Sequence, residues 1–265
     1  MKARVVSTYS AAADHYDHPA NHFWDRFGRG TVARLAIPSG SRVLDLCCGT
    51  GASALPAAEA AGPAGRVVGV DLSEELLELA RRKASQRGLR NVDFVCADIM
   101  APGIDLGLFD HVICVFGVFF IPDMVAAVRT MWRCVDRGGG LAVTTWGAGV
   151  FEPANSLFWD AVRRKRPQLY KSFNPWDRVS EPQTLRQLFR DAELPEPDIM
   201  EEKSLHPLHT DDNVRALLFG TGYRAALDQL TTAEQSQILV SVVEGLRSQG
   251  AADVRADVIY AIRRK

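Results

Sequence analysis

Three aspartates end consecutive apolar, strand-like segments of the sequence, and two glycines follow the first of them. Asp45 lies in "VLDLCCGTG", Asp71 ends "VVGVD" and Asp98 ends "FVCAD". Gly49 and Gly51 stand in the turn after the first segment, where glycine lets a ligand approach the backbone closely. A carboxylate at a strand end can accept hydrogen bonds from hydroxyl or amino groups and attract a cation. The spacing therefore predicts a binding site for a ligand that carries such groups.

Short apolar segments alternate with helical periods between residues 41 and 146, and this alternation must position the three acids. Such a rhythm predicts an α/β fold with a doubly wound, mostly parallel sheet and right-handed crossovers. Ligands bind such sheets outside the carboxyl ends of the strands. The expected strands are 42–47, 66–72, 91–98, 109–116, 138–146, 198–208 and 257–265, and the expected helices are 52–62, 73–88, 122–135 and 181–194.

Three segments stand outside this alternation. Residues 1–37 are expected to form N-terminal lid helices ahead of a domain that spans 38–265. Two insertions, at about 147–180 and 209–250, are rich in aromatic or helical residues and are expected to form a helical cap over one end of the sheet.

Composition narrows the class of protein. The net charge is −1, with 47% hydrophobic and 24% charged residues, which is ordinary for a globular enzyme and does not favour nucleic acid or anionic membranes as partners. The start of the chain has no apolar signal region and no 18-residue apolar stretch follows, so a cytoplasmic protein without membrane contact is expected. Association with a second copy of the chain stays open.

The five cysteines show no C-x-x-C spacing, and we expect no metal site. Cys47, Cys96 and Cys114 fall in or beside apolar strands, where buried, reduced thiols are expected. A site for trivalent arsenic is the alternative for several neighbouring cysteines.

The glycine turn by itself fits two kinds of ligand. "GTGASA" satisfies the G-x-G-x-x-G/A pattern of dinucleotide sites, and Asp71 lies at the spacing at which an acid bonds the hydroxyls of a ribose. Asp45, four residues before Gly49, would repel a pyrophosphate, and no Tyr-x-x-x-Lys pair occurs. S-adenosylmethionine carries a sulfonium and an ammonium group and no phosphate, so the same acid would attract it. Asp98 could then accept from the adenine amino group while Ile99 packs on the ring.

Five motifs, in order and at family-like intervals, resemble the class I methyltransferases that use S-adenosylmethionine. They are "VLDLCCGTG", "VVGVDLS", "FVCADIM", "FDHVICVFGVFFIPD" and "VDRGGGLAVTTWG", and "LRQLFRDAEL" extends the likeness. The chain is most similar to the branch that includes the ubiquinone and menaquinone C-methyltransferases and many small-molecule methyltransferases. The resemblance implies a seven-stranded, Rossmann-like sheet and an enzyme that methylates a small, apolar or aromatic metabolite on oxygen, nitrogen or carbon.

The resemblance also implies roles for individual residues. The residues expected to contact the cofactor are Tyr16, Asp45, Cys47, Gly49, Gly51, Asp71, Leu72, Asp98, Ile99, Val115 and Phe116. Asp45 and the two glycines would hold the methionine end. Asp71 would bind the ribose, and Leu72 would lie against the adenine.

The remaining implied contacts come from later strands and from the N-terminal segment. Asp98 and Ile99 would frame the adenine, and Val115 and Phe116 would line the floor of the pocket. "YSAAADHYDHPA" resembles the lid helix of the family, where Tyr9 or Tyr16 would close over the cofactor, with core packing as the alternative.

The acceptor and any catalytic base are left open by the sequence. The family often has paired histidines where this chain has Phe119 and Phe120, which either form an apolar acceptor pocket or anchor a loop. His22 is the best single candidate for a base, because it lies beside two aromatic residues. The aromatic residues of the cap are expected either to line the acceptor site or to form the core of the cap: Phe151, Phe158, Trp159, Phe173 and Trp176.

Two other functions remain compatible with these motifs. One is an enzyme that binds the cofactor without methylating, such as a cyclase on the same fold. The other is an NAD-dependent oxidoreductase. A nucleic acid acceptor is not expected, because "VFGVFF" stands where adenine methylases of this fold carry a Pro-Pro-aromatic motif.

Overall fold

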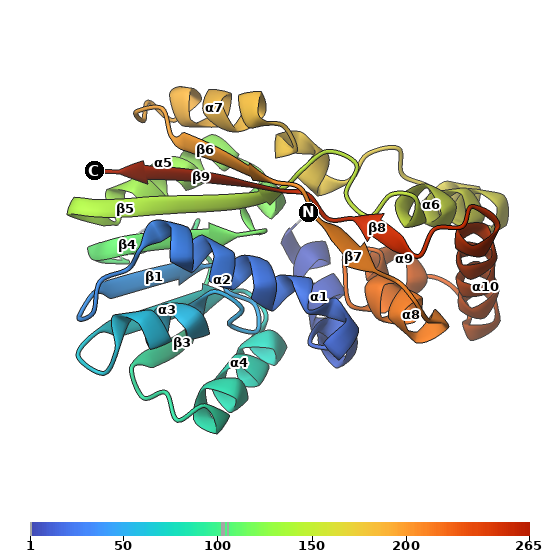
Figure 1. Cartoon of the computed structure of the whole chain (residues 1–265), viewed down its shortest axis with the longest axis horizontal. Helices are drawn as coiled ribbons and strands as arrows, with labels where there is room; N and C mark the ends of the chain where they lie inside the picture. Colours follow the sequence, from blue (N-terminus) through green and yellow to red (C-terminus); the bar gives the residue numbers. More distant parts are fainter. Residues whose placement is uncertain (1, 102–103, 105) are drawn as a thin grey trace.

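A seven-stranded sheet forms the centre of the computed structural model, which describes residues 2–101, 104 and 106–265 (Figure 1). Its strands are β1 (Arg42–Leu46), β2 (Arg66–Asp71), β3 (Val92–Cys96), β4 (Phe109–Val115), β5 (Val135–Trp146), β6 (Asp198–Glu202) and β9 (Val258–Arg264). They lie in the order β3-β2-β1-β4-β5-β9-β6, and β9 runs antiparallel to both of its neighbours. The expected doubly wound, mostly parallel seven-stranded sheet is confirmed.

Helices cover both faces of this sheet. Helices α3 (Ala54–Ala61) and α4 (Glu74–Gln86) share one apolar core with it, and α5 (Met124–Arg133) and α7 (Pro182–Asp191) share the other, while α2 (Phe23–Leu35) contributes residues to both. Local signals start these helices where the sequence predicts them. The Ser73 hydroxyl accepts from the Leu76 N–H at the start of α4, and Asp123 accepts from the Ala126 N–H at the start of α5. The helices thereby fix the carboxyl ends of the strands at one edge.

The two insertions pack against each other and form one helical cap beyond this edge (Figure 1). Its elements are α6 (Ala154–Lys165), η3 (Pro167–Leu169), η4 (Pro175–Val179), α8 (Asp211–Phe219), α9 (Arg224–Leu227) and α10 (Thr232–Ser248). A Cβ added to Gly245 of α10 would lie 2.5 Å from the Leu157 side chain of α6, so the two helices pack closely here. The expected helical cap is therefore present.

One expected strand is divided in two. The sequence predicts a single strand over 198–208, but the chain forms β6 and then β7 (Leu205–Pro207), which pairs with β8 (Asp253–Arg255) in a separate two-stranded sheet. Between β6 and β7 the Ser204 N–H donates to the Asp257 carboxylate at 2.8 Å instead of to a strand. The small sheet lies between the central sheet and helices α8–α10 and connects the two (Figure 1).

The N-terminal helices lie in two different environments. Helix α1 (Lys2–Tyr16) packs against α4, α8 and α9, and so lies between the sheet layers and the cap. After η1 (Pro19–Asn21), α2 packs against β4 and β5 as part of a sheet layer. A short turn, η2 (Val118–Phe120), follows β4. Helix α1 and η1 therefore border the cap, and the Asn21 side chain of η1 donates to the Ala216 carbonyl of α8 at 2.9 Å.

All five cysteines are free. Cys48, Cys114 and Cys134 are buried and Cys47 is half-buried, but Cys96 is exposed because it ends β3, the edge strand. The expectation of a buried thiol is therefore wrong at Cys96. Across the described residues, no helix combines the length and the apolar character that crossing a bilayer requires.

Candidate functional site

The carboxyl ends of β1, β2 and β4 border a cavity of about 330 Å³, here called the strand-end cavity. Nine of the eleven residues expected to contact a cofactor line it, and they are Tyr16, Cys47, Gly49, Asp71, Leu72, Asp98, Ile99, Val115 and Phe116. The fold thus brings residues from four separate sequence motifs and from α1 to one place. Asp45 and Gly51 are not among the lining residues.

Asp71 is held by three backbone donors at the mouth of β2. Its Oδ2 accepts from the Gly49 N–H at 2.9 Å, and its Oδ1 accepts from the Leu72 and Ser73 N–H groups at 2.7 and 3.0 Å. Burial raises the pKa of Asp71 above its usual range, and these donors partly offset that effect. A carboxylate has about four acceptor positions, so about one remains, on Oδ2, for a ligand. One ligand hydroxyl, rather than two, fits this carboxylate as it stands.

Asp45 lies completely buried beneath the cavity. Its Oδ2 accepts from the Ser53 hydroxyl at 2.7 Å, and its Oδ1 has no hydrogen-bond partner among the described residues. Burial raises the pKa of Asp45 to about 7. An unpartnered, buried carboxylate oxygen is costly, and a cationic group brought by a ligand would remove that cost.

Positive backbone φ angles shape the turn after β1. Gly49 has φ +53° and Gly51 has φ +83°, which favours glycine at both positions. Cys47, with φ +60°, and Phe116, with φ +54°, adopt the same uncommon region without being glycine, and both line the cavity. Phe116 is held by stacking on Trp146 at a ring separation of 3.9 Å. The uncommon left-handed backbone conformation therefore occurs at the ends of β1 and β4, where Cys47 and Phe116 line the cavity.

Helix α1 closes one side of the strand-end cavity with two tyrosines. Tyr9 and Tyr16 both line it, and burial raises the pKa of each phenol, so both are neutral at physiological pH. Tyr16 stacks on Trp24 with ring centres 5.0 Å apart and an interplanar angle of 1°. A Cβ added to Gly49 would lie 3.3 Å from the Tyr16 hydroxyl, so the phenol lies directly over the glycine turn.

Sequence analysis did not assign several other residues to this cavity. They are Val6, Trp24, Val70, Ser73, Leu76, Ala97, Met100, Gly117, Phe120, Ile121 and Pro122. Five of them directly adjoin an expected residue in the sequence, and this adjacency is the signal that could have found them: Val70, Ser73, Ala97, Met100 and Gly117. Val6 and Trp24 carry no such signal, because the packing of α1 and α2 brings them there.

A second cavity, of about 290 Å³ and here called the cap cavity, shares Tyr9 and Phe120 with the first. It is lined by Thr8, Tyr9, Phe119, Phe120, Trp159, Lys171, Phe173, Asn174, Pro175, Trp176, Arg178, Gly222 and Ala225. Because two side chains are common to both linings, the two cavities are neighbours. A ligand in one would be separated from a ligand in the other only by these side chains.

The five aromatic residues of the cap divide between the two expected roles. Trp159, Phe173 and Trp176 line the cap cavity, whereas Phe151 and Phe158 are buried in the core. Phe173 is 54% exposed, so it contributes little to that core. At the two phenylalanines after β4, Phe120 lines both cavities, and Phe119 is buried but also touches the cap cavity.

Two cations and no carboxylate are found among the described residues that line the cap cavity. The Arg178 guanidinium donates to the carbonyl oxygens of Phe119, Ile121 and Pro122 at 3.2, 3.0 and 2.9 Å, so it holds the turn that carries Phe120. Lys171 lies with its ammonium 5.8 Å from the centre of the Trp159 ring. The charge balance of this lining favours a neutral or anionic occupant over a cationic one.

No histidine lines either cavity in the part of the chain that the structure describes. His22, the candidate base, is exposed at the start of α2, and its ring lies 5.0 Å from the ring of His206. His111 is buried within β4. Within the same described residues, no group of three or more His, Cys, Asp or Glu side chains is arranged to hold a metal ion.

Comparison with known proteins shows which sequences the chain is similar to. A family described as a methyltransferase domain matches residues 43–139. Aklanonic acid methyltransferase DauC of Streptomyces sp. (strain C5) is 36% identical over 187 residues, which cover 66% of this chain and 85% of that protein. A demethylmenaquinone methyltransferase of Anoxybacillus flavithermus is 31% identical over 140 residues, and this match spans 51% of the chain and 59% of that relative.

Solved structures share the whole architecture at low sequence identity. The YcgJ protein of Bacillus subtilis superposes with a TM-score of 0.58 at 18% identity, covering 91% of this chain and 99% of that one. The [4+2]-cyclase SpnF superposes with a TM-score of 0.54 at 20% identity, covering 91% of this chain and 81% of that one. At these identities the likeness concerns the fold alone.

Proposed function

Because the chain belongs to the class I S-adenosylmethionine-dependent methyltransferases, we propose that it methylates a small aromatic acceptor whose nucleophilic atom is already ionised near neutral pH. The family makes the chain an S-adenosylmethionine-dependent methyltransferase of small molecules. The aromatic, acid-free cap cavity, which meets the acid-lined strand-end cavity at Tyr9 and Phe120, carries the proposal about the acceptor.

The strand-end cavity fits S-adenosylmethionine better than a dinucleotide. No Lys, Arg or His lines it among the described residues, so a pyrophosphate would lack a cationic partner there. Asp45 is buried beneath this lining rather than part of it, so its carboxylate would favour the ammonium of the methionine end through its charge and not through a direct contact. We assign one ribose hydroxyl to Asp71 and the adenine to Asp98, Ile99 and Leu72, beside one another in the lining. The family and this lining together argue against the alternative of an NAD-dependent oxidoreductase.

Tyr16, Cys47, Val115 and Phe116 complete the proposed cofactor contacts from the remaining sides. Gly51 acts indirectly in this proposal. Its N–H donates to the Cys48 carbonyl at 2.9 Å, and this bond closes the turn that carries Gly49.

The acceptor is placed by this proposal in the cap cavity, where Trp159, Phe173 and Trp176 provide flat apolar walls. Lys171 and Arg178 make that cavity unfavourable for an amine that carries a positive charge. Two relatives are named for an acid and a quinone, and both names agree with an anionic or neutral acceptor. A flat, acidic aromatic metabolite satisfies all of these constraints.

Of the described residues, Tyr9 and Phe120 are those that line both cavities, and neither is an evident general base. Burial raises the pKa of Tyr9 and Tyr16, and a hydrogen bond with Cys114 together with burial raises that of Cys47, so none is ionised near pH 7. Bound S-adenosylmethionine supplies a methyl carbon on a positively charged sulfur and leaves as S-adenosylhomocysteine. The protein's part is then to exclude water and align the acceptor atom with that carbon, which can supply a large share of the acceleration. The acceptor must arrive with its proton already lost.

Release of S-adenosylhomocysteine in the presence of matched acceptors tests this proposal. We expect turnover with anthraquinone-2-carboxylate or a hydroxyanthraquinone and none with an aminomethyl analogue. The pH dependence of kcat/KM should follow the pKa of each acceptor, because no protein group removes the proton. Phe173→Ala should raise the KM for the acceptor about tenfold, the loss expected for an aromatic contact, without changing cofactor affinity.

Two outcomes would contradict the proposal. Preferred turnover of a cationic aliphatic amine would exclude the acceptor class. Tight binding of S-adenosylhomocysteine without product from any acceptor would point instead to a non-methylating enzyme on the same fold.

A further inference from the structure

We propose that Thr50, Asp17 and Lys83 form a clasp that holds the end of α1 on the glycine turn and sets how long the cofactor stays bound. This inference rests on the proposed cofactor site and adds positioning residues to it. The three residues, here called the lid clasp, belong to the turn after β1, the end of α1 and α4.

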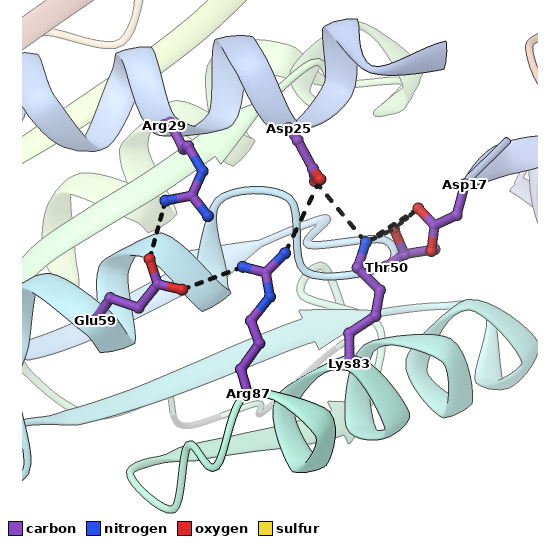
Figure 2. A network of polar contacts seen from close by, with 7 residues as sticks. All are labelled: Asp17, Asp25, Arg29, Thr50, Glu59, Lys83 and Arg87. Carbon is purple, nitrogen blue, oxygen red and sulfur yellow. Dashed lines mark hydrogen bonds and ion pairs between the residues drawn. The ribbon is translucent and has the colours of Figure 1, made fainter. Parts of the chain in front are cut away.

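A closed triangle of hydrogen bonds defines the lid clasp (Figure 2). The Thr50 hydroxyl donates to Asp17 Oδ1 at 2.7 Å, and the Lys83 ammonium donates to the same oxygen at 3.1 Å and to the Thr50 hydroxyl at 3.2 Å. Thr50 is completely buried, and the side chains of Lys83 and Asp17 are 19% and 29% exposed. Partial burial and a shared oxygen make these contacts stronger than an isolated surface ion pair.

The lid clasp lies directly behind the residues that cover the cavity. Asp17 follows Tyr16 in the chain, and Thr50 lies between Gly49 and Gly51. The bond from Thr50 to Asp17 therefore joins the neighbour of the covering tyrosine to the neighbour of the covered glycine. Because Tyr16 lies over Gly49 in contact distance, a shift of Asp17 would carry the phenol away from the turn.

Other contacts also hold α1, including its last turn, where the Asn21 side chain donates to the His15 carbonyl at 3.0 Å, but those named here do not join it to the glycine turn. The Ser10 hydroxyl donates to Glu75 and lies 3.0 Å from the Ser73 hydroxyl, and Arg224 pairs with Asp14 at 3.0 Å. Loss of the lid clasp should therefore loosen the end that carries Tyr16 without releasing the whole helix.

An outer set of ion pairs continues from the lid clasp and provides a matched control (Figure 2). Lys83 lies 3.8 Å from Asp25, and beyond it Arg29 pairs with Glu59 at 2.9 Å between α2 and α3. Arg29 and Glu59 are 51% and 38% exposed, and neither lines the cavity. They share the network but not the proposed role.

The test compares the dissociation rate of S-adenosylhomocysteine from four variants by stopped-flow fluorescence of Trp24, which stacks on Tyr16. We expect Thr50→Val and Lys83→Met, each of which removes two of the three hydrogen bonds of the lid clasp, to speed dissociation about five- to tenfold. Both should raise the KM for S-adenosylmethionine more than they lower kcat. Thr50→Ser keeps the hydroxyl and should retain the wild-type rate, and Arg29→Met should behave like the wild type.

A wild-type dissociation rate and unchanged Trp24 emission in folded Thr50→Val would overturn the proposal. If Thr50→Val does not fold, Asp17→Asn and a salt series on the wild type replace it. Salt at about 1 M should then speed dissociation, because screening weakens the ion pair, and a rate independent of both changes would also overturn it. Failure of the wild type to bind S-adenosylhomocysteine would instead refute the proposed cofactor site.

Discussion

The strand-end cavity and the cap cavity are built in opposite ways. The first is assembled from short motifs, each at the end of one parallel strand, and it contains two of the three strand-end acids in its lining. The second takes its walls from α1, η2, η4 and the segments around them, and its charged residues are Lys171 and Arg178. A local motif can therefore specify the cofactor half of such an enzyme, whereas the acceptor half depends on how distant segments pack.

Asp71→Ala gives the sharpest test of this separation. The change removes a buried acceptor and leaves the N–H groups of Gly49, Leu72 and Ser73 without their partner. We expect the binding free energy of S-adenosylhomocysteine to weaken by about 3 kcal/mol, which is roughly 100-fold in affinity. Calorimetry measures the affinity. Asp93→Ala is the control, because Asp93 is an exposed acid on β3 whose side chain is 61% exposed. Equal affinities in the two variants would contradict the proposed role of Asp71.

Phe120→Ala tests the wall that the two cavities share. Removing the ring should join the two cavities and let the acceptor atom move out of line with the methyl group. The kcat should therefore fall about tenfold, while the affinity for S-adenosylhomocysteine changes little. Steady-state kinetics with both substrates varied gives the two effects separately. Phe120→Leu keeps an apolar wall and should lose less. A loss confined to cofactor affinity would show that Phe120 serves only the strand-end cavity.

Titration of Asp45 gives the smallest expected effect. Since burial raises its pKa to about 7, the ligand-free protein holds this carboxyl protonated below that pH, and binding of an ammonium group would release the proton. Affinity for S-adenosylhomocysteine should therefore fall, by at most about tenfold per pH unit, as the pH drops below 7. Asp45→Asn should remove this dependence. A pH-independent affinity in the wild type would exclude this electrostatic role of Asp45.

The same raised pKa has a consequence for stability. The folded protein binds this proton more tightly than the unfolded chain, so the contribution of Asp45 to the free energy of unfolding should decrease as the pH rises from about 4 to 7. Thermal melts of the wild type and Asp45→Asn would differ in that pH window.

The strands were predicted well because each has a recognisable pattern in its own short stretch of sequence. Continuous apolar segments ended by an acid or a glycine turn identify β1, β2 and β4 within a few residues. The break between β6 and β7 was missed because its cause is the bond from Ser204 to Asp257, which is distant in sequence. The exposure of Cys96 was missed for the same reason, since only the strand order makes β3 an edge.

The site shows the same limit at the level of single residues. Nine of the eleven expected contacts line the strand-end cavity, because they adjoin strand ends or the glycine turn. Asp45 was expected to face the ligand, yet its side chain lies beneath the cavity, against Ser53. Alternation along a strand sets which face a side chain takes, but not whether another side chain lies between it and the ligand.

The sequence by itself determined the sheet, its glycine turn and the acids that mark a site for S-adenosylmethionine, because each depends on contacts within a few residues. Only the tertiary structure decided the acceptor walls and the lid clasp. Lys83 is 66 residues from Asp17 in the chain, and Phe173 and Phe120 approach Tyr9 from the cap and from η2. Such neighbours result from the burial of apolar surface over the whole fold, which no short motif records.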